Sequence, residues 1–273
     1  MTTIRKEDFI SSLRDALQYI ACYHPPDFIQ AMHGAWQRET ADPDAFPLPP
    51  DDGRRGVSLP PRPPAHAAEE PDGYLDRPAS VSASELRSAV AGTPFGAALA
   101  AVSVVLSAYS PDGVVELGVT SSTKDHAAVD PIVGYFLNSL PLVVDVDAGR
   151  SLADIDDDAN ELVRGVLPHR SAPFAEIVRA ARRDGRRSPD ISHMLAYERL
   201  APARFGELDA ELHIVMAPSA VNDLTFFVHE QGDELRLGLE HRGSAVPAAL
   251  AERLLGAFDE VLLAICRSPA RTA

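Results

Sequence analysis

Ten prolines fall within residues 42–80, and this density decides how the rest of the chain can be organised. They are Pro43, Pro47, Pro49, Pro50, Pro60, Pro61, Pro63, Pro64, Pro71 and Pro78. Because proline removes a backbone donor and restricts φ, neither a continuous helix nor a central strand can run through this stretch. We therefore expect an extended, partly polyproline-like linker over residues 42–80, which separates residues 1–41 from a compactly patterned region, residues 81–269.

The first 41 residues are predicted to form a helical hairpin. Apolar residues recur at helical spacing from Phe9 to Ile20, and the Pro25-Pro26 pair ends this helix. A second amphipathic segment follows and carries Trp36, which we expect to pack within the hairpin rather than bind a ligand.

Three segments of this hairpin, 4–10, 15–20 and 23–31, resemble the extreme N-terminus of class I iron–sulfur fumarases. In that family the cluster-binding cysteines and the substrate-binding basic residues lie further downstream. The chain has only two cysteines, so the resemblance does not imply fumarase activity. A gene fusion, or reuse of the hairpin as an adaptor, would explain it.

From Val81 onward, strand-like and helix-like segments alternate, which predicts an α/β fold. Serine or threonine caps are expected to begin three helices, at Ser82 or Ser84, at Thr93 and at Ser151, and a final amphipathic helix spans 250–265. Strands are predicted at 114–119, 140–146, 193–199, 211–216, 223–229 and 234–241, the last two forming a hairpin through Gln231-Gly232-Asp233. The aspartates Asp154, Asp156, Asp157 and Asp158 are expected to form a solvated helix start rather than a metal site.

Charge and cysteine content exclude several classes of function. Asp and Glu outnumber Lys and Arg by 40 to 25, and a net charge of −15 disfavours nucleic-acid binding. The two cysteines, Cys22 and Cys266, are far apart and have no metal-ligand spacing, so we expect no metal site. The chain shows neither a signal-peptide pattern nor an apolar run of membrane-spanning length, so we expect a cytoplasmic protein without a membrane partner.

Five short motifs follow one another between residues 93 and 225. They are Thr93-Pro94-Phe95; Gly134-Tyr135-Phe136-Leu137-Asn138-Ser139; Pro173-Phe174 within residues 169–176; Arg183-Asp184 with Arg187-Ser188-Pro189; and Asn222-Asp223-Leu224-Thr225. In this order they resemble motifs in the C-terminal lobe of nonribosomal peptide synthetase condensation domains, over roughly residues 81–269. Two departures stand out, because Arg170-Ser171 replaces a Gln-Asp pair and the fourth motif has one extra residue.

The resemblance implies a mixed-sheet sandwich like one lobe of the chloramphenicol-acetyltransferase-like condensation fold. It also implies a role in joining two carrier-bound acyl groups through an amide bond. The family's catalytic motif, His-His-x-x-x-Asp-Gly, belongs to the other lobe. No two of the nine histidines in this sequence are adjacent, so the motif is missing here.

His126 is the one position that could be mistaken for this motif. His126 and Asp130 fit His-x-x-x-Asp, which would make His126 a general base, but Pro131 replaces the glycine. The match also lies directly before Gly134, where the family has a loop, so we favour a surface-loop role. The catalytic residue is left unknown.

The same resemblance yields the candidate binding residues. Asn138 and Ser139 are candidates for substrate binding at the cleft floor, although Asn138 could equally cap a strand end by bonding backbone. Arg183, Arg186 and Arg187 could meet the phosphopantetheine phosphate of a carrier protein or an acidic helix; a solvated basic turn is the alternative.

Two functional hypotheses follow from the motifs present and missing. In the first, this is a truncated condensation-domain-like protein that is not catalytic alone and acts with a synthetase subunit or carrier protein. In the second, it is half of a split amide-forming enzyme whose histidine lobe another chain supplies. A fumarase-derived metabolic enzyme and an acyltransferase centred on His126 are the remaining alternatives. No cofactor is expected beyond phosphopantetheine on a partner carrier protein.

Overall fold

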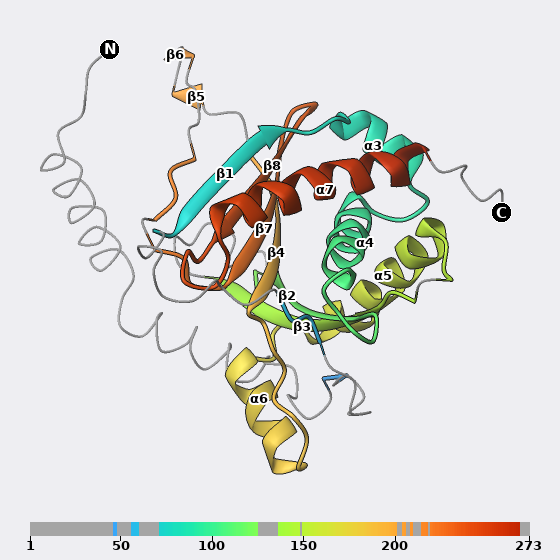
Figure 1. Ribbon diagram of the computed structural model, residues 1–273, viewed down its shortest axis with the longest axis vertical. Helices are drawn as coiled ribbons and strands as arrows, with labels where there is room; N and C mark the ends of the chain where they lie inside the picture. The colour runs from blue at the N-terminus through green and yellow to red at the C-terminus, as the bar shows by residue number, and fades with distance from the viewer. Residues whose placement is uncertain are drawn as a thin grey trace, which may run out of the picture.

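The computed structural model describes residues 46–47, 56–59, 71–124, 136–147, 149–200, 204–205, 208–209, 214–217 and 219–267 (Figure 1). Its elements are β1 (Gly73–Pro78), α3 (Ala83–Ala89), α4 (Pro94–Ser107), β2 (Val114–Ser122), β3 (Leu137–Asp145), α5 (Leu152–Val166), the short 3-10 helix η2 (Leu167–His169), α6 (Phe174–Arg183), β4 (His193–Arg199), β5 (Arg204–Phe205), β6 (Leu208–Asp209), β7 (Leu224–Gln231), β8 (Glu234–His241) and α7 (Ala248–Arg267). The predicted hairpin at 1–41, Trp36 and His126 lie outside the described residues.

Six strands form one mixed sheet in the order β1-β8-β7-β4-β2-β3. Strand β4 runs parallel to both β2 and β7, whereas β1 with β8, β7 with β8, and β2 with β3 are antiparallel pairs. The predicted α/β fold with a mixed sheet is therefore confirmed.

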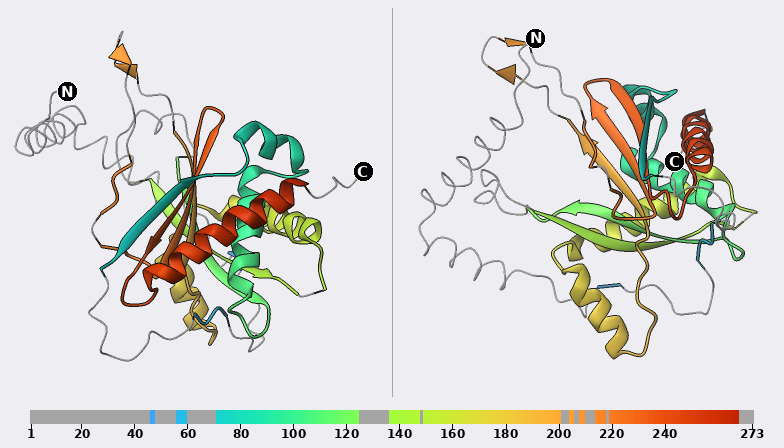
Figure 2. Two further views of the ribbon diagram at one scale, coloured as in Figure 1. Left: turned by 45° about the horizontal axis from the view of Figure 1, so that its top comes forward. Right: turned by 60° about the vertical axis from the view of Figure 1, so that its left-hand side comes forward.

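The helices α3, α4, α5 and α7 lie on one face of the sheet, as the right-hand view of Figure 2 shows. Leu224, Phe226 and Val228 alternate along β7 and are fully buried in the core toward this layer. Phe226 meets Phe258 of α7 edge-to-face, with 5.6 Å between ring centroids. The period-2 alternation of β7 thus buries one row of side chains against the helices.

Local capping chemistry explains where three helices begin. Ser82 forms a capping box with Glu85 at α3, and Ser151 forms one with Asp154 at α5. The Thr93 hydroxyl accepts from the Gly96 amide at the start of α4. All three predicted caps are confirmed, as is the β7–β8 hairpin, whose turn contains Gly232 at φ 63°.

Several elements differ from the sequence-based expectation, among them helix α6, which was not predicted. Strand β1 lies within the stretch predicted to be linker, where it pairs with β8 along the edge of the sheet. An edge strand tolerates proline, and Pro78 stands at the last position of β1. The strand predicted at 211–216 does not include residues 214–216, which have no regular structure, and residues 211–213 lie outside the described residues. Strands β5 and β6 form a separate two-stranded sheet.

The aspartates at the start of α5 were expected to be solvated, and for Asp156 this is wrong. Asp156 is only 5% exposed, and the Asn160 side-chain amide donates to its Oδ1 over 3.0 Å. Asn160 in turn accepts from the backbone amide and the hydroxyl of Thr93, over 2.8 and 2.9 Å. Asp156 therefore belongs to the junction that joins α5 to the start of α4.

None of the helices in the described residues has by itself the length and apolar composition of a membrane span. Helices α3 and α4 reach that length and composition only together, and they are bent by 88° relative to one another. Within the same residues, no group of three or more His, Cys, Asp or Glu side chains is placed to hold a metal ion.

We predict that Asp156→Asn stabilises the protein at alkaline pH. Burial, with a smaller contribution from the charge of Asp157, raises the pKa of Asp156 to about 6. The Asp156 carboxyl therefore has a higher pKa in the folded protein than in the unfolded chain. The stability that depends on its protonation is fully present below the pKa of the unfolded chain and is lost as the pH rises through 6. The variant should gain roughly 1–3 kcal/mol in free energy of unfolding at pH 8 and nothing at pH 4. Urea unfolding followed by circular dichroism at both pH values measures this.

The matched control is Glu161→Gln, an exposed carboxylate on the same helix. Because Glu161 is exposed, this substitution should change the free energy of unfolding by less than about 0.5 kcal/mol at either pH. An Asp156→Asn variant with an equally pH-independent effect would contradict the assignment of a buried, raised-pKa carboxyl.

Candidate functional site

Asn138, near the start of β3, holds the turn that leads into α6. Its side-chain nitrogen donates to the carbonyl oxygens of Arg170 and Ala172, over 2.9 and 2.6 Å. Its side-chain oxygen accepts from the amide of Phe174 over 3.2 Å. The N-cap of α6 is Pro173, which supplies no side-chain cap, so Asn138 satisfies an amide that the helix leaves free. Of the two roles left open for Asn138, backbone bonding is the one that these contacts support.

Ser139 does not join Asn138 in one site. The two residues are neighbours along β3, so their side chains point to opposite faces of the sheet. Ser139 lies opposite Thr120 of β2 and is half-buried.

A buried carboxylate, Glu116 of β2, anchors the segment that follows α6. Glu116 is 5% exposed; it pairs with the Arg187 guanidinium at 2.5 Å and accepts from the Asp190 amide over 2.7 Å. This ion pair draws residues 187–190 onto the sheet. Arg187 is therefore a structural anchor as well as a candidate contact to a partner.

The other two predicted arginines lie at the C-terminal end of α6, which extends away from the main helix layer in Figure 1. The Arg183 guanidinium is exposed and lies 3.6 Å from the Asp184 carboxylate. Arg186 is half-buried in the turn after Gly185, which has a φ of 71°. Cationic side chains at this helix end suit the partial negative charge of its free carbonyl groups. We call Arg183, Arg186 and Arg187 the basic turn.

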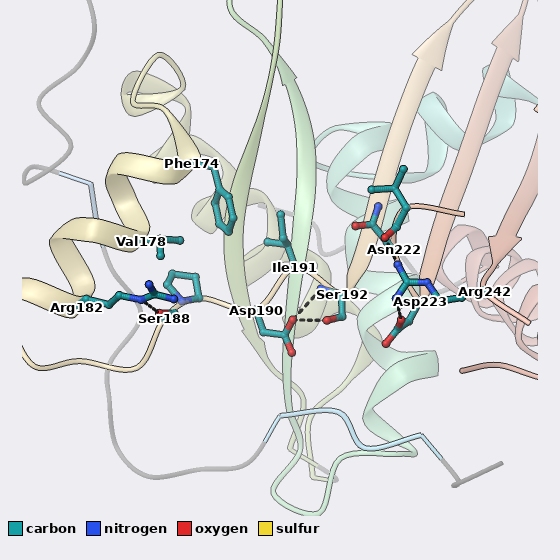
Figure 3. A pocket seen from close by; sticks show the side chains of 12 residues that line it. Phe174, Val178, Arg182, Ser188, Asp190, Ile191, Ser192, Asn222, Asp223 and Arg242 are labelled. Carbon is teal, nitrogen blue, oxygen red and sulfur yellow. Dashed lines mark hydrogen bonds and ion pairs between the residues drawn. The ribbon is translucent and has the colours of Figure 1, made fainter. Parts of the chain in front are cut away.

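A pocket of about 380 Å³ lies beside α6 (Figure 3). Three segments that are distant in sequence line it: the α6 residues Phe174, Val178 and Arg182, the loop 188–192, and the loop 221–223 together with Arg242. Phe174, Ser188-Pro189 and Asn222-Asp223 belong to three of the sequence motifs. The structure thus brings three motifs to one cavity.

Charged groups of both signs face this pocket. Arg242 pairs with Asp223 at 2.7 Å and also donates to the carbonyl oxygen of Val221. The Arg182 guanidinium donates to the Ser188 hydroxyl over 2.9 Å. Asp190 uses one oxygen to accept from the amide and the hydroxyl of Ser192, over 2.8 and 2.6 Å. The four charges sum to zero.

One histidine adjoins the pocket, and one lies at the other end of β7. Burial lowers the pKa of His193, the first residue of β4, although the charges of Asp190 and Asp223 act in the opposite direction. His229 lies near the end of β7, 3.2 Å from the Tyr74 hydroxyl and 3.3 Å from the Glu198 carboxylate. These contacts join β1, β4 and β7 away from the pocket.

Sequence reasoning missed Glu116, Asp190 and Arg242. Glu116 carried a signal, since it is a lone charge within the apolar run Val114–Val119, and such a charge needs a buried partner. Arg242 carried none, because its role depends on where β8 ends relative to β7.

We predict that Asn138→Ala loosens the entry to α6. The change strands two carbonyl oxygens and one amide, so the free energy of unfolding should fall by about 1–3 kcal/mol. Hydrogen exchange at the Phe174 amide should accelerate more than exchange in β7. Chemical unfolding and exchange measured by mass spectrometry provide these numbers.

Ser139→Ala is the control, since the same strand and the adjacent position are altered. It should change the free energy of unfolding by less than about 0.5 kcal/mol. Equal effects of the two substitutions would rule out the special role of Asn138.

Comparison with known proteins places these observations in a family. The family model described as "Condensation domain" matches residues 93–273. The chain is 23% identical to malpibaldin synthetase of Mortierella alpina over 255 residues, which cover 89% of the chain and 4% of the synthetase. It is 24% identical to tyrocidine synthase 3 of Brevibacillus parabrevis over 191 residues, covering 68% of the chain and 3% of that synthase. The chain therefore spans only a small part of these relatives.

Solved structures show the same fold. A four-domain nonribosomal peptide synthetase bound to AMP and glycine superposes with a TM-score of 0.63 at 20% identity, covering 86% of this chain and 19% of that one. The first condensation domain of the CDA synthetase superposes with a TM-score of 0.62 at 18% identity, covering 80% and 49%.

These comparisons do not support the fumarase-like reading of residues 1–41. They confirm the resemblance found in the five motifs of the α/β region. With three of those motifs meeting at one pocket and the family model covering residues 93–273, the chain belongs to the condensation-domain family of nonribosomal peptide synthetases.

Proposed function

We propose that this protein serves as the C-terminal lobe of a condensation unit in nonribosomal peptide biosynthesis and does not form amide bonds alone. The observation that carries the proposal is the convergence of three family motifs on one pocket beside α6. The sequence supplies no His-His pair, which supports dependence on a histidine-bearing lobe from a partner.

Two candidate functions are consistent with this dependence on a partner. In one, the chain is a non-catalytic auxiliary that docks to a synthetase subunit or carrier protein. In the other, it is half of a split enzyme, and the catalytic cleft forms where it meets the histidine lobe. The ion pair between buried Glu116 and exposed Arg187 supports both candidates, as do the hydrogen bonds of Asn138, because these contacts order the surface around α6 before any partner binds. The proposed setting is the cytoplasm.

We further propose that the basic turn receives the carrier protein. Arg183 and Arg187 are exposed, although each already has an ion-pair partner in its own chain, and the chain as a whole carries −15. A basic turn on an acidic protein is suited to steering an acidic helix or a phosphopantetheine phosphate toward α6.

The first test is turnover. The purified chain, mixed with aminoacyl-loaded donor and acceptor carrier proteins, should give no amide product by mass spectrometry. Adding a separate polypeptide with a His-His-x-x-x-Asp-Gly lobe from the same pathway should produce it if the enzyme is split, and should not if the chain is auxiliary. Product from the purified chain alone would contradict both candidates.

The second test is carrier binding. The double variant Arg183→Gln/Arg186→Gln should weaken binding of a phosphopantetheinylated carrier protein by roughly tenfold at low salt, and 1 M salt should remove most of the difference. Fluorescence anisotropy with a labelled carrier measures both.

Arg253→Gln, which removes one exposed positive charge from α7, is the control and should leave the affinity unchanged. Arg187 is omitted, because its loss would strand the buried Glu116 and confuse binding with stability. Equal affinities for the double variant and the control would show that the carrier docks elsewhere.

A further inference from the structure

We propose that the pocket beside α6 binds a free zwitterionic small molecule of the α-amino-acid class. This site goes beyond the proposed function, because it would bind its ligand without a histidine lobe or a carrier protein. Its volume of about 380 Å³ falls within the range of small-molecule sites.

The charge arrangement selects a ligand that carries both signs. Arg182 and Arg242 balance Asp190 and Asp223, so the lining has no net charge. An anion would be drawn to the guanidinium groups and repelled by the carboxylates, and a simple cation would meet the reverse. A zwitterion can satisfy both sets at once.

The lining also has hydrogen-bonding capacity left over. The only side-chain bond that the structure gives Arg182 is from its Nε to Ser188, so in the described part of the chain both terminal nitrogens lack a partner. Asp190 and Asp223 each use one carboxylate oxygen, and the second oxygen of each has no hydrogen-bond partner among the described residues. In Figure 3 Asp190 lies between Arg182 and the Asp223–Arg242 pair, so Arg182 is suited to the ligand carboxylate and Asp190 to its ammonium group.

An apolar wall provides a place for the side chain of such a ligand. Phe174 and Val178 of α6 and Ile191 of the adjoining loop line the same pocket (Figure 3). Burial of an apolar substituent here would add affinity that glycine cannot gain. The geometry thus favours amino acids with a large apolar side chain.

The test is isothermal titration of the full chain with four probes: L-phenylalanine, glycine, phenethylamine and 3-phenylpropionate. L-Phenylalanine should bind at least roughly tenfold more tightly than each of the other three. Glycine lacks the apolar side chain, phenethylamine lacks the carboxylate, and 3-phenylpropionate lacks the ammonium group. No saturable binding of L-phenylalanine, or similar binding of all four, would overturn the proposal. Tightest binding of the carboxylate alone would show a simple anion site and would overturn it too.

Two variants test the polarity of the site. Arg182→Gln should abolish the preference for L-phenylalanine over phenethylamine while keeping the preference over 3-phenylpropionate. Asp190→Asn should abolish the preference for L-phenylalanine over 3-phenylpropionate while keeping the preference over phenethylamine. Asparagine retains a side-chain oxygen that can accept from Ser192. Glu252→Gln and Arg253→Gln on α7 are controls that should change nothing. Near-UV circular dichroism checks that each variant is folded. A folded variant that loses affinity without these changes in selectivity would contradict the assignment.

Discussion

The buried carboxylate of Glu116 connects the core of this protein to its candidate site. It lies near the start of β2, buried in the sheet, where an unpaired charge would cost several kcal/mol. Arg187 and the Asp190 amide satisfy it, and in doing so they hold the loop after α6 against the sheet. Without that loop the pocket would lose one of its walls.

Strand direction explains why the remaining walls meet at the same place. Strands β4 and β7 are parallel neighbours, so the loops that enter them, 188–192 and 221–223, lie at the same edge of the sheet. Strand β8 is antiparallel to β7, and it therefore ends at this edge and delivers Arg242. Asn138 completes the arrangement, because it fixes the turn from which α6 begins.

Family membership and mechanism stand on different evidence. The condensation fold rests on the match over residues 93–273 and on the superposed structures. The relatives are far longer than this chain, so their activities enter only as a basis for the proposals. The proposed carrier protein and the proposed zwitterionic ligand concern different places, the basic turn and the pocket beside α6.

Much of the fold could be predicted because its signals are local. Ser82, Thr93 and Ser151 cap helices through bonds to amides three residues away, and the hairpin at Gly232 follows from its turn. Strand β1 was hidden by neighbouring prolines, since only pairing with β8 makes it a strand. Helix α6 was also missed, because its cap comes from Asn138, distant in sequence.

The family resemblance, the alternation of strands and helices, and the candidates Asn138, Arg183, Arg186 and Arg187 could all be predicted from the sequence. The contacts of these residues could not, and neither could the burial of Asp156 or the exposure of Arg183. The physical reason is the separation along the sequence between the interacting residues. Caps and turns act over a few residues, whereas the partners of Glu116, Asn138 and Arg242 come from loops whose meeting depends on the order and direction of the strands.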